Sequence, residues 1–135
     1  QTRMICSIHP RTASKLTNSI IQSLSPLVEF HEPFGFFDFV NLEKHARLVL
    51  TDSGTVQEEC CIFQVPTVTI RTTTERPETI ECGSNLLSGI QREQIFQAAQ
   101  VMLKQTDSWN CPDGYLDPSV SNKVVNLLLG GIGVV

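Results

Sequence analysis

Short runs of apolar residues alternate along this chain with segments that show a helical period. The apolar runs predict buried strands, because they are continuous instead of alternating with polar positions, and Thr67–Ile70 is β-branched throughout. The predicted strands are Met4–Ile8, Leu27–Phe30, Arg47–Thr51, Thr67–Ile70 and Asn85–Ser88.

The segments between these strands carry apolar residues one helical turn apart, which is typical of amphipathic helices. Pro26 stops the first of them, and Pro77 suits the first turn of a later one. We expect Phe36 and Phe96 to face the core. The predicted helices are Thr12–Leu24, Gly35–Ala46, Gly54–Phe63, Pro77–Cys82, Arg92–Gln105 and Ser121–Leu129.

This alternation of strand and helix with short links predicts an α/β fold, a Rossmann-like parallel sheet with helices on both faces. The length of 135 residues suits one domain. With 41% hydrophobic and 18% charged residues, the chain has the composition of a globular protein and not of a disordered one.

Composition excludes several other classes. The net charge is −4 and no basic run is present, so we expect no nucleic-acid partner. No apolar run is long enough to span a membrane, and no signal-peptide pattern opens the chain. The five cysteines form an odd set without a CxxC pair, which argues against a structural zinc site or a disulfide framework. We therefore expect reduced cysteines, no bound metal and a cytoplasmic protein.

Polar and cationic residues follow the predicted strands at the ends where open parallel sheets bind ligands. His9 follows the first strand, Ser53–Thr55 follows the third, and Arg76 comes after the fourth. Ser53 and Gly54 also lie where a helix begins, and the free amides and dipole of a helix start favour an anion. Neither a P-loop lysine nor a GxGxxG motif is present, so an ATPase loop and a dinucleotide fingerprint are both excluded.

The two glutamates of the helix after Ser53 differ in direction. With Val56 and Cys60 on the buried stripe, Glu59 lies on its flank and Glu58 lies on the opposite, solvated face. Glu59 can reach a ligand hydroxyl, or it can be a solvated residue at the edge of the buried stripe. Ser53 equally fits an ordinary helix N-cap.

The other candidates also have purely structural interpretations. Arg76 suits a phosphate through its guanidinium group, or a surface ion pair with Glu78 or Glu81. His9 fits a histidine at a strand end. Phe39 fits a core position.

Several stretches of the chain together resemble one known family, the non-hydrolysing UDP-N-acetylglucosamine 2-epimerases. The match runs from about Met4 to Gly130, and the order and spacing of its two longest polar motifs are highly specific. The stretches are TDSGTVQEE (51–59), PTVTIR (66–71), TTERPE (73–78), ECGSNLLSG (81–89) and HPRT (9–12).

The resemblance implies a two-lobed enzyme of the glycosyltransferase-B-like fold that binds a UDP-sugar between its lobes. Residues 1–135 resemble a single C-terminal, nucleotide-binding lobe, which in the family begins one strand and one helix earlier. By position in the motifs, Ser53, Gly54 and Thr55 are expected to hold the diphosphate, Glu59 the ribose hydroxyls and Arg76 a phosphate, with Phe39 beside the uracil and His9 lining the same cleft.

The family reaction interconverts UDP-GlcNAc and UDP-ManNAc. It removes the C2 proton and eliminates UDP in an anti sense, which gives a glycal intermediate. UDP adds back after the proton returns on the other face, without a metal or redox cofactor. The acid and base carboxylates of the family lie in its N-terminal lobe. We therefore expect no catalytic residue in this chain and no activity from it alone.

Departures from the family pattern leave the substrate open. Thr55 and Thr72 stand where the family usually has Gly and Asp, and Cys60 and Cys61 stand where it has Ala or Pro. The alternatives are an epimerase acting on another UDP-2-acetamido sugar, a glycosyltransferase lobe, or a UDP-binding module without chemistry.

We also expect the chain to form a homodimer. An incomplete parallel sheet leaves backbone edges unpaired, and apolar residues cover more than one face of the predicted helix Ser121–Leu129.

Overall fold

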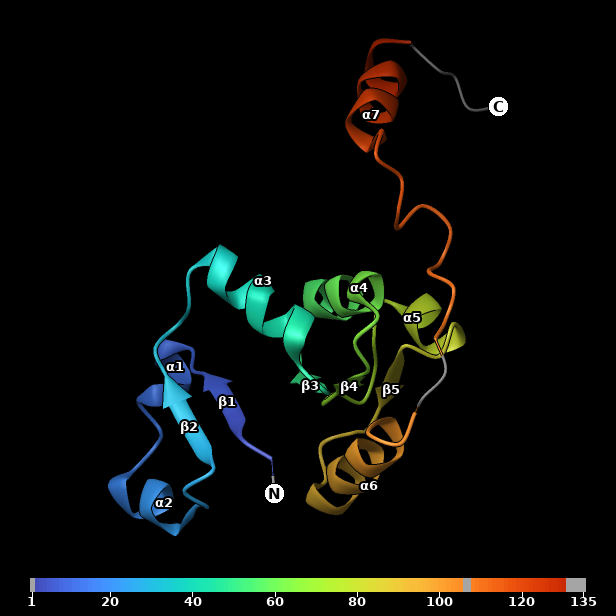
Figure 1. The fold of residues 1–135 in the computed structure, drawn as a ribbon. Helices are drawn as coiled ribbons and strands as arrows, with labels where there is room; N and C mark the ends of the chain where they lie inside the picture. Colours follow the sequence, from blue (N-terminus) through green and yellow to red (C-terminus); the bar gives the residue numbers. More distant parts are fainter. Residues whose placement is uncertain (1, 106–107, 131–135) are drawn as a thin grey trace. The chain divides into compact units, whose positions relative to one another are not determined.

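The chain divides into two compact units in the computed structural model, which describes residues 2–105 and 108–130 (Figure 1). The units are Gln1–Leu42 and Glu43–Val135. Helix α3 (Phe36–His45) contains the boundary between them. That residues 1–135 form a single C-terminal, nucleotide-binding lobe stays a prediction.

The first unit is built around a two-stranded parallel sheet. Strand β1 (Met4–Ser7) pairs with β2 (Val28–His31), with Met4 opposite Val28. Two short helices connect them, α1 (Pro10–Ala13) and α2 (Asn18–Ser23).

The prediction of one helix over Thr12–Leu24 is wrong. Thr17 has an extended backbone (φ −90°, ψ 155°), and its hydroxyl accepts a hydrogen bond from the amide of Ile20. Thr17 therefore acts as an N-cap that starts a new helix and interrupts the apolar period.

The second unit contains a three-stranded parallel sheet in the order β3-β4-β5. Its register places Thr51 opposite Thr69, and Thr69 opposite Leu87, so the strands end at one common edge. Helix α4 lies on one side of this sheet and α6 on the other (Figure 1). The elements of this unit are β3 (Val49–Thr51), α4 (Gly54–Phe63), β4 (Thr67–Thr69), α5 (Pro77–Glu81), β5 (Asn85–Leu87), α6 (Arg92–Met102) and α7 (Val120–Leu129). The predicted α/β class with parallel strands is confirmed.

The apolar core of the second unit is centred on β4. Val68 is fully buried and packs with Ala98 and Met102 of α6. Phe96 is 63% exposed, so the prediction that it faces the core is wrong. Helix α6 packs through the small side chain of Ala98, which rotates Phe96 towards solvent.

The prediction for Phe36 is also wrong, because this first residue of α3 is 69% exposed.

Buried polar side chains form much of the interior of the second unit. No helix within residues 2–105 and 108–130 combines the length and apolar character that a membrane crossing requires.

Candidate functional site

The start of α4 lies just beyond the carboxyl end of β3. Ser53 is the N-cap residue, with an extended backbone (φ −89°, ψ 131°) and a hydroxyl that accepts from the amide of Val56 at 3.5 Å. A helix start leaves four amides without intrahelical acceptors. Ser53 satisfies one of them, and the amides of Gly54 and Thr55 are left as donors where the helix dipole favours an anion. The N-cap interpretation of Ser53 is confirmed, and it is compatible with an anion site.

The guanidinium group of Arg76 lies against this helix start. A Cβ added to Gly54 would lie 3.9 Å from both Cζ and Nη2 of Arg76. Nε of Arg76 donates to the carboxylate of Glu58, and Nη1 donates to the backbone carbonyl of Glu75 at 3.1 Å. Among the described residues Nη2 has no hydrogen-bond partner. The nitrogen that faces Gly54 is therefore available to an anion.

The partner of Arg76 corrects two predictions. Glu58 was expected to be solvated, but its side chain is half-buried and forms an ion pair with Arg76. Glu78 and Glu81 were the expected partners, whereas the carboxylate of Glu78 accepts from the hydroxyl of Tyr115 at 2.8 Å. The hydrogen bond and charge of Glu58 raise the pKa of Arg76, so the guanidinium remains charged.

Two carboxyl groups with raised pKa values lie on α3 and α4. Glu59 is partly buried, and burial, followed by the charge of Glu58, raises its pKa. Glu43 is only 3% exposed, and neither of its carboxylate oxygens has a hydrogen-bond partner within the described residues. Burial, reinforced by the charge of Glu59, raises the pKa of Glu43 to about 7. Both carboxyl groups are therefore more readily protonated than an ordinary glutamate.

Sequence reasoning missed Glu43, although a signal was present. Glu43 follows Phe39 and Val40 at the spacing of one helical turn, so it continues the apolar stripe of α3. A glutamate inside such a stripe indicates a buried carboxyl group.

Two of the predicted site residues belong to the first unit. His9 is exposed and is the N-cap residue of α1, where its Nδ1 accepts from the amide of Arg11 at 3.2 Å. Phe39 is half-buried on α3. Both residues remain predictions as ligand contacts.

The second unit brings Ser53, Gly54 and Arg76 together, as the positions of their strand ends predicted. Thr55 is exposed in the first turn of α4, and Glu59 lies one turn further along the same helix. The site therefore consists of a helix N-terminus, a guanidinium group and a flanking carboxyl group.

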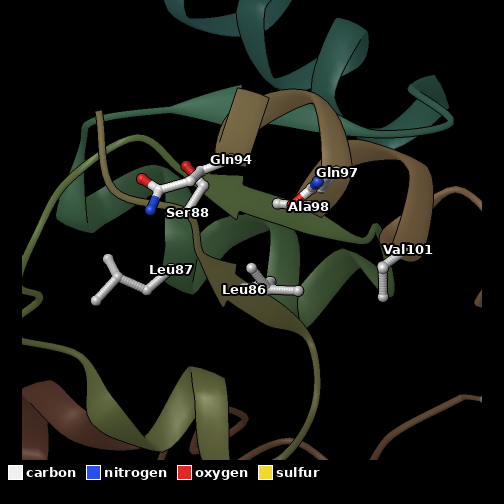
Figure 2. A pocket seen from close by; sticks show the side chains of 7 residues that line it. All are labelled: Leu86, Leu87, Ser88, Gln94, Gln97, Ala98 and Val101. Atoms are coloured by element: carbon white, nitrogen blue, oxygen red, sulfur yellow. The ribbon is translucent and has the colours of Figure 1, made fainter. Parts of the chain in front are cut away.

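A separate cavity of about 300 Å³ lies between β5 and α6 (Figure 2). None of its lining residues is titratable, and none is a predicted site residue. We therefore do not assign the candidate site to this cavity. Its lining residues are Leu86, Leu87, Ser88, Gln94, Gln97, Ala98 and Val101.

Comparison with known proteins identifies relatives of this chain. Residues 1–129 match the family model described as UDP-N-acetylglucosamine 2-epimerase. The UDP-N-acetylglucosamine 2-epimerase of Methanococcus maripaludis is 43% identical over 133 residues, which are 96% of this chain and 36% of that protein. The UDP-2,3-diacetamido-2,3-dideoxy-D-glucuronate 2-epimerase of Pseudomonas aeruginosa is 36% identical over 105 residues, 76% of this chain and 28% of that protein.

A solved structure agrees with these sequence relationships. The crystal structure of the Methanocaldococcus jannaschii UDP-GlcNAc 2-epimerase in complex with UDP-GlcNAc and UDP superposes with a TM-score of 0.85 at 41% identity. The superposition covers 96% of this chain and 36% of that one, so the chain spans about a third of the length of these relatives. The chain belongs to the UDP-N-acetylglucosamine 2-epimerase family.

Proposed function

We propose that this chain is the UDP-binding lobe of an isomerase that interconverts UDP-GlcNAc and UDP-ManNAc. The observation that carries the proposal is the position of the Arg76 guanidinium group against Gly54, at the N-terminus of α4. Two independent sources of positive potential, a side-chain cation and a helix start, converge there on one small volume. A diphosphate is the part of a UDP-sugar that matches them.

The roles of the residues follow from their chemistry. The amides of Gly54 and Thr55 and the hydroxyl of Ser53 bind the diphosphate oxygens, and Nη2 of Arg76 neutralises their charge. The lack of a Cβ at Gly54 lets a phosphate approach the backbone.

The remaining three residues contact other parts of the ligand in this proposal. Glu59 accepts hydrogen bonds from the ribose hydroxyls, Phe39 lies beside the uracil, and His9 faces the sugar or the diphosphate. The resemblance of the motifs and the membership of the family support these roles.

The proposed reaction proceeds by anti elimination of UDP across C1 and C2, which gives a glycal intermediate. A proton then returns to the opposite face of C2, and UDP adds back at C1. Negative charge develops on the departing diphosphate as the C1–O bond breaks. The donors of α4 and Arg76 are already oriented towards that charge, so they lower the barrier electrostatically. The proton at C2 is removed and returned by groups outside this chain, which is therefore inactive by itself.

A specific observation also favours a second substrate. The relative from Pseudomonas aeruginosa is named as an epimerase of a diacetamido glucuronate nucleotide. Thr55, in the first turn of α4, and Thr72, which follows β4 in the chain, depart from the family pattern. Another UDP-2-acetamido sugar is therefore the second candidate, with the same mechanism.

We propose that the protein acts as a homodimer in the cytoplasm. The exposed apolar side chains of α7 support association, and the odd number of cysteines supports a reducing compartment.

Isotope exchange tests the proposed function. The full-length protein, in which this chain is joined to the region that its relatives carry, is incubated with UDP-GlcNAc in heavy water. We expect deuterium at C2 and the appearance of UDP-ManNAc. UDP binding without deuterium incorporation would favour a binding module, and exchange only with another UDP-2-acetamido sugar would favour the second substrate. Transfer of the sugar to an acceptor without a glycal intermediate would identify a glycosyltransferase.

A further inference from the structure

A buried polar network lies beneath the candidate site. Gln57 of α4 is fully buried, and its carboxamide has three partners from three segments of the chain. Nε2 donates to the backbone carbonyl of Ser53 at 3.1 Å. Oε1 accepts from the hydroxyl of Thr74 at 2.7 Å and from Nδ2 of Asn85 at 3.2 Å. One side chain thus joins the helix start, the loop before α5, and β5.

The same network fixes the backbone of Arg76 on both sides. The hydroxyl of Thr74 accepts from the amide of Arg76 at 3.1 Å, and the hydroxyl of Thr79 donates to its carbonyl at 2.8 Å. Thr74 is bonded to Gln57, and Thr79 accepts from Nδ2 of Asn85 at 3.1 Å. Two chains of hydrogen bonds therefore run from the carboxamide of Gln57 to the main chain of Arg76.

The direction of these hydrogen bonds is determined by the groups themselves. Thr74 accepts from an amide, so its single hydroxyl proton is left to donate to Gln57. Asn85 uses its amide nitrogen for Gln57 and Thr79, and its Oδ1 accepts from Thr69 on the central strand at 2.9 Å. Gln57 is the member that both accepts from the Arg76 side and donates to the Ser53 side.

We propose that Gln57 is a positioning residue, which sets the distance between the first turn of α4 and the guanidinium group of Arg76. The inference rests on the proposed function, because that distance matters only to a ligand that contacts both groups, as a diphosphate does. Uridine lacks the diphosphate and does not depend on the distance. A displacement of about 1 Å between binding groups is enough to weaken a fitted ligand severely.

A purely structural role is the competing explanation, since a satisfied buried network also stabilises a fold. The two roles differ in what they change. If the role is structural, removing the Gln57 carboxamide lowers the melting temperature and leaves the ratio of UDP affinity to uridine affinity unchanged. If Gln57 positions the binding groups, the same removal lowers that ratio.

The chain offers a matched pair of threonines to separate these effects. Thr79 and Thr67 are both fully buried, and the hydroxyl of each donates to a backbone carbonyl. Thr79 belongs to the network, whereas the hydroxyl of Thr67 bonds to Val65 at 3.2 Å and does not reach Arg76. Thr79→Val and Thr67→Val thus remove the same group at equal burial.

The experiment measures the dissociation constants of UDP and uridine by calorimetry in the full-length protein. We expect Gln57→Met and Thr79→Val to weaken UDP by about tenfold or more, with uridine changed less than about twofold. Thr67→Val is expected to lower the melting temperature and to leave the ratio unchanged.

A pH profile adds a second readout. Gln57→Glu keeps the shape of the side chain, but an ionised carboxylate cannot donate to the carbonyl of Ser53. A protonated carboxyl group can, so we expect the UDP affinity of Gln57→Glu to recover from about pH 8 to about pH 5.5, with no recovery in Gln57→Met. A wild-type UDP-to-uridine ratio in both Gln57→Met and Thr79→Val would overturn the inference alone. Failure of the wild-type protein to prefer UDP over uridine would overturn the proposed function as well.

Discussion

The carboxylate of Glu58 on α4 holds the Nε atom of Arg76, the residue that caps α5. The ion pair orients the guanidinium group so that Nη2 lies beside Gly54. A planar guanidinium group can satisfy a carboxylate with one edge and an anion with the other, which an ammonium group cannot do. Glu58 therefore positions the cation.

The first prediction concerns this orienting carboxylate. Glu58→Gln removes the charge that fixes Arg76, so we expect UDP to bind more weakly by about 1 kcal/mol, or roughly fivefold, with uridine unaffected. Calorimetry with both ligands measures the effect. Tighter binding of UDP would instead show that Glu58 competes with the diphosphate for Arg76.

The second prediction concerns the buried carboxyl group of Glu43. Its pKa in the folded chain is about 7, above the ordinary value of 4.5, so the folded state retains a proton that the unfolded state loses. The free energy of unfolding therefore falls as pH rises from about 4.5 to about 7, by roughly 2–3 kcal/mol from this group. Glu59, whose pKa is also raised, contributes in the same direction.

Glu43→Gln tests this pH dependence. We expect the variant to be more stable than the wild-type chain at pH 8 and to show a flatter dependence, measured by thermal unfolding between pH 5 and pH 8. Glu81→Gln, which changes an exposed glutamate on α5, serves as the control and should leave the slope unchanged. Equal slopes for Glu43→Gln and the wild type would contradict the prediction.

The third prediction concerns association. Apolar residues are exposed along α7, among them Leu128 and Leu129. We expect the chain to dimerise in a concentration-dependent way, as measured by size-exclusion chromatography with light scattering, and Leu128→Glu to reduce the dimer. Leu116→Glu replaces an equally apolar, exposed residue outside α7 and should have no such effect. A monomer at all concentrations would contradict the prediction.

Local signals predicted α4 with correct bounds. Gly54–Phe63 is the helix that the sequence indicated, because an N-cap serine after a strand and an apolar stripe are both encoded within that segment. The adjacency of Ser53, Gly54 and Arg76 followed from the rule that parallel strands end at one edge.

Two of the errors arose where distant residues determine the environment, and one arose from a local cap. The partner of Glu58, Arg76, lies 18 residues further along the chain. The helical period of α4 alone therefore could not show that Glu58 is half-buried instead of solvated. Gln57 is polar, so its own side chain gives no reason to expect burial, whereas hydrogen bonds from Thr74 and Asn85 make its burial possible. Thr17 interrupted a continuous apolar period with a local cap, which the period cannot reveal.

Binding of UDP and uridine to Arg76→Ala tests the central claim most directly. Arg71→Ala is the matched control, since Arg71 carries the same charge on the same edge of the sheet but is engaged by both carboxylate oxygens of Glu75 at 2.8 and 2.9 Å. We predict that Arg76→Ala weakens UDP by roughly 30-fold and leaves uridine unchanged, while Arg71→Ala affects neither ligand by more than about twofold. Equal losses of UDP and uridine in Arg76→Ala, or equal losses of UDP in the two variants, would contradict a diphosphate site at Gly54 and Arg76.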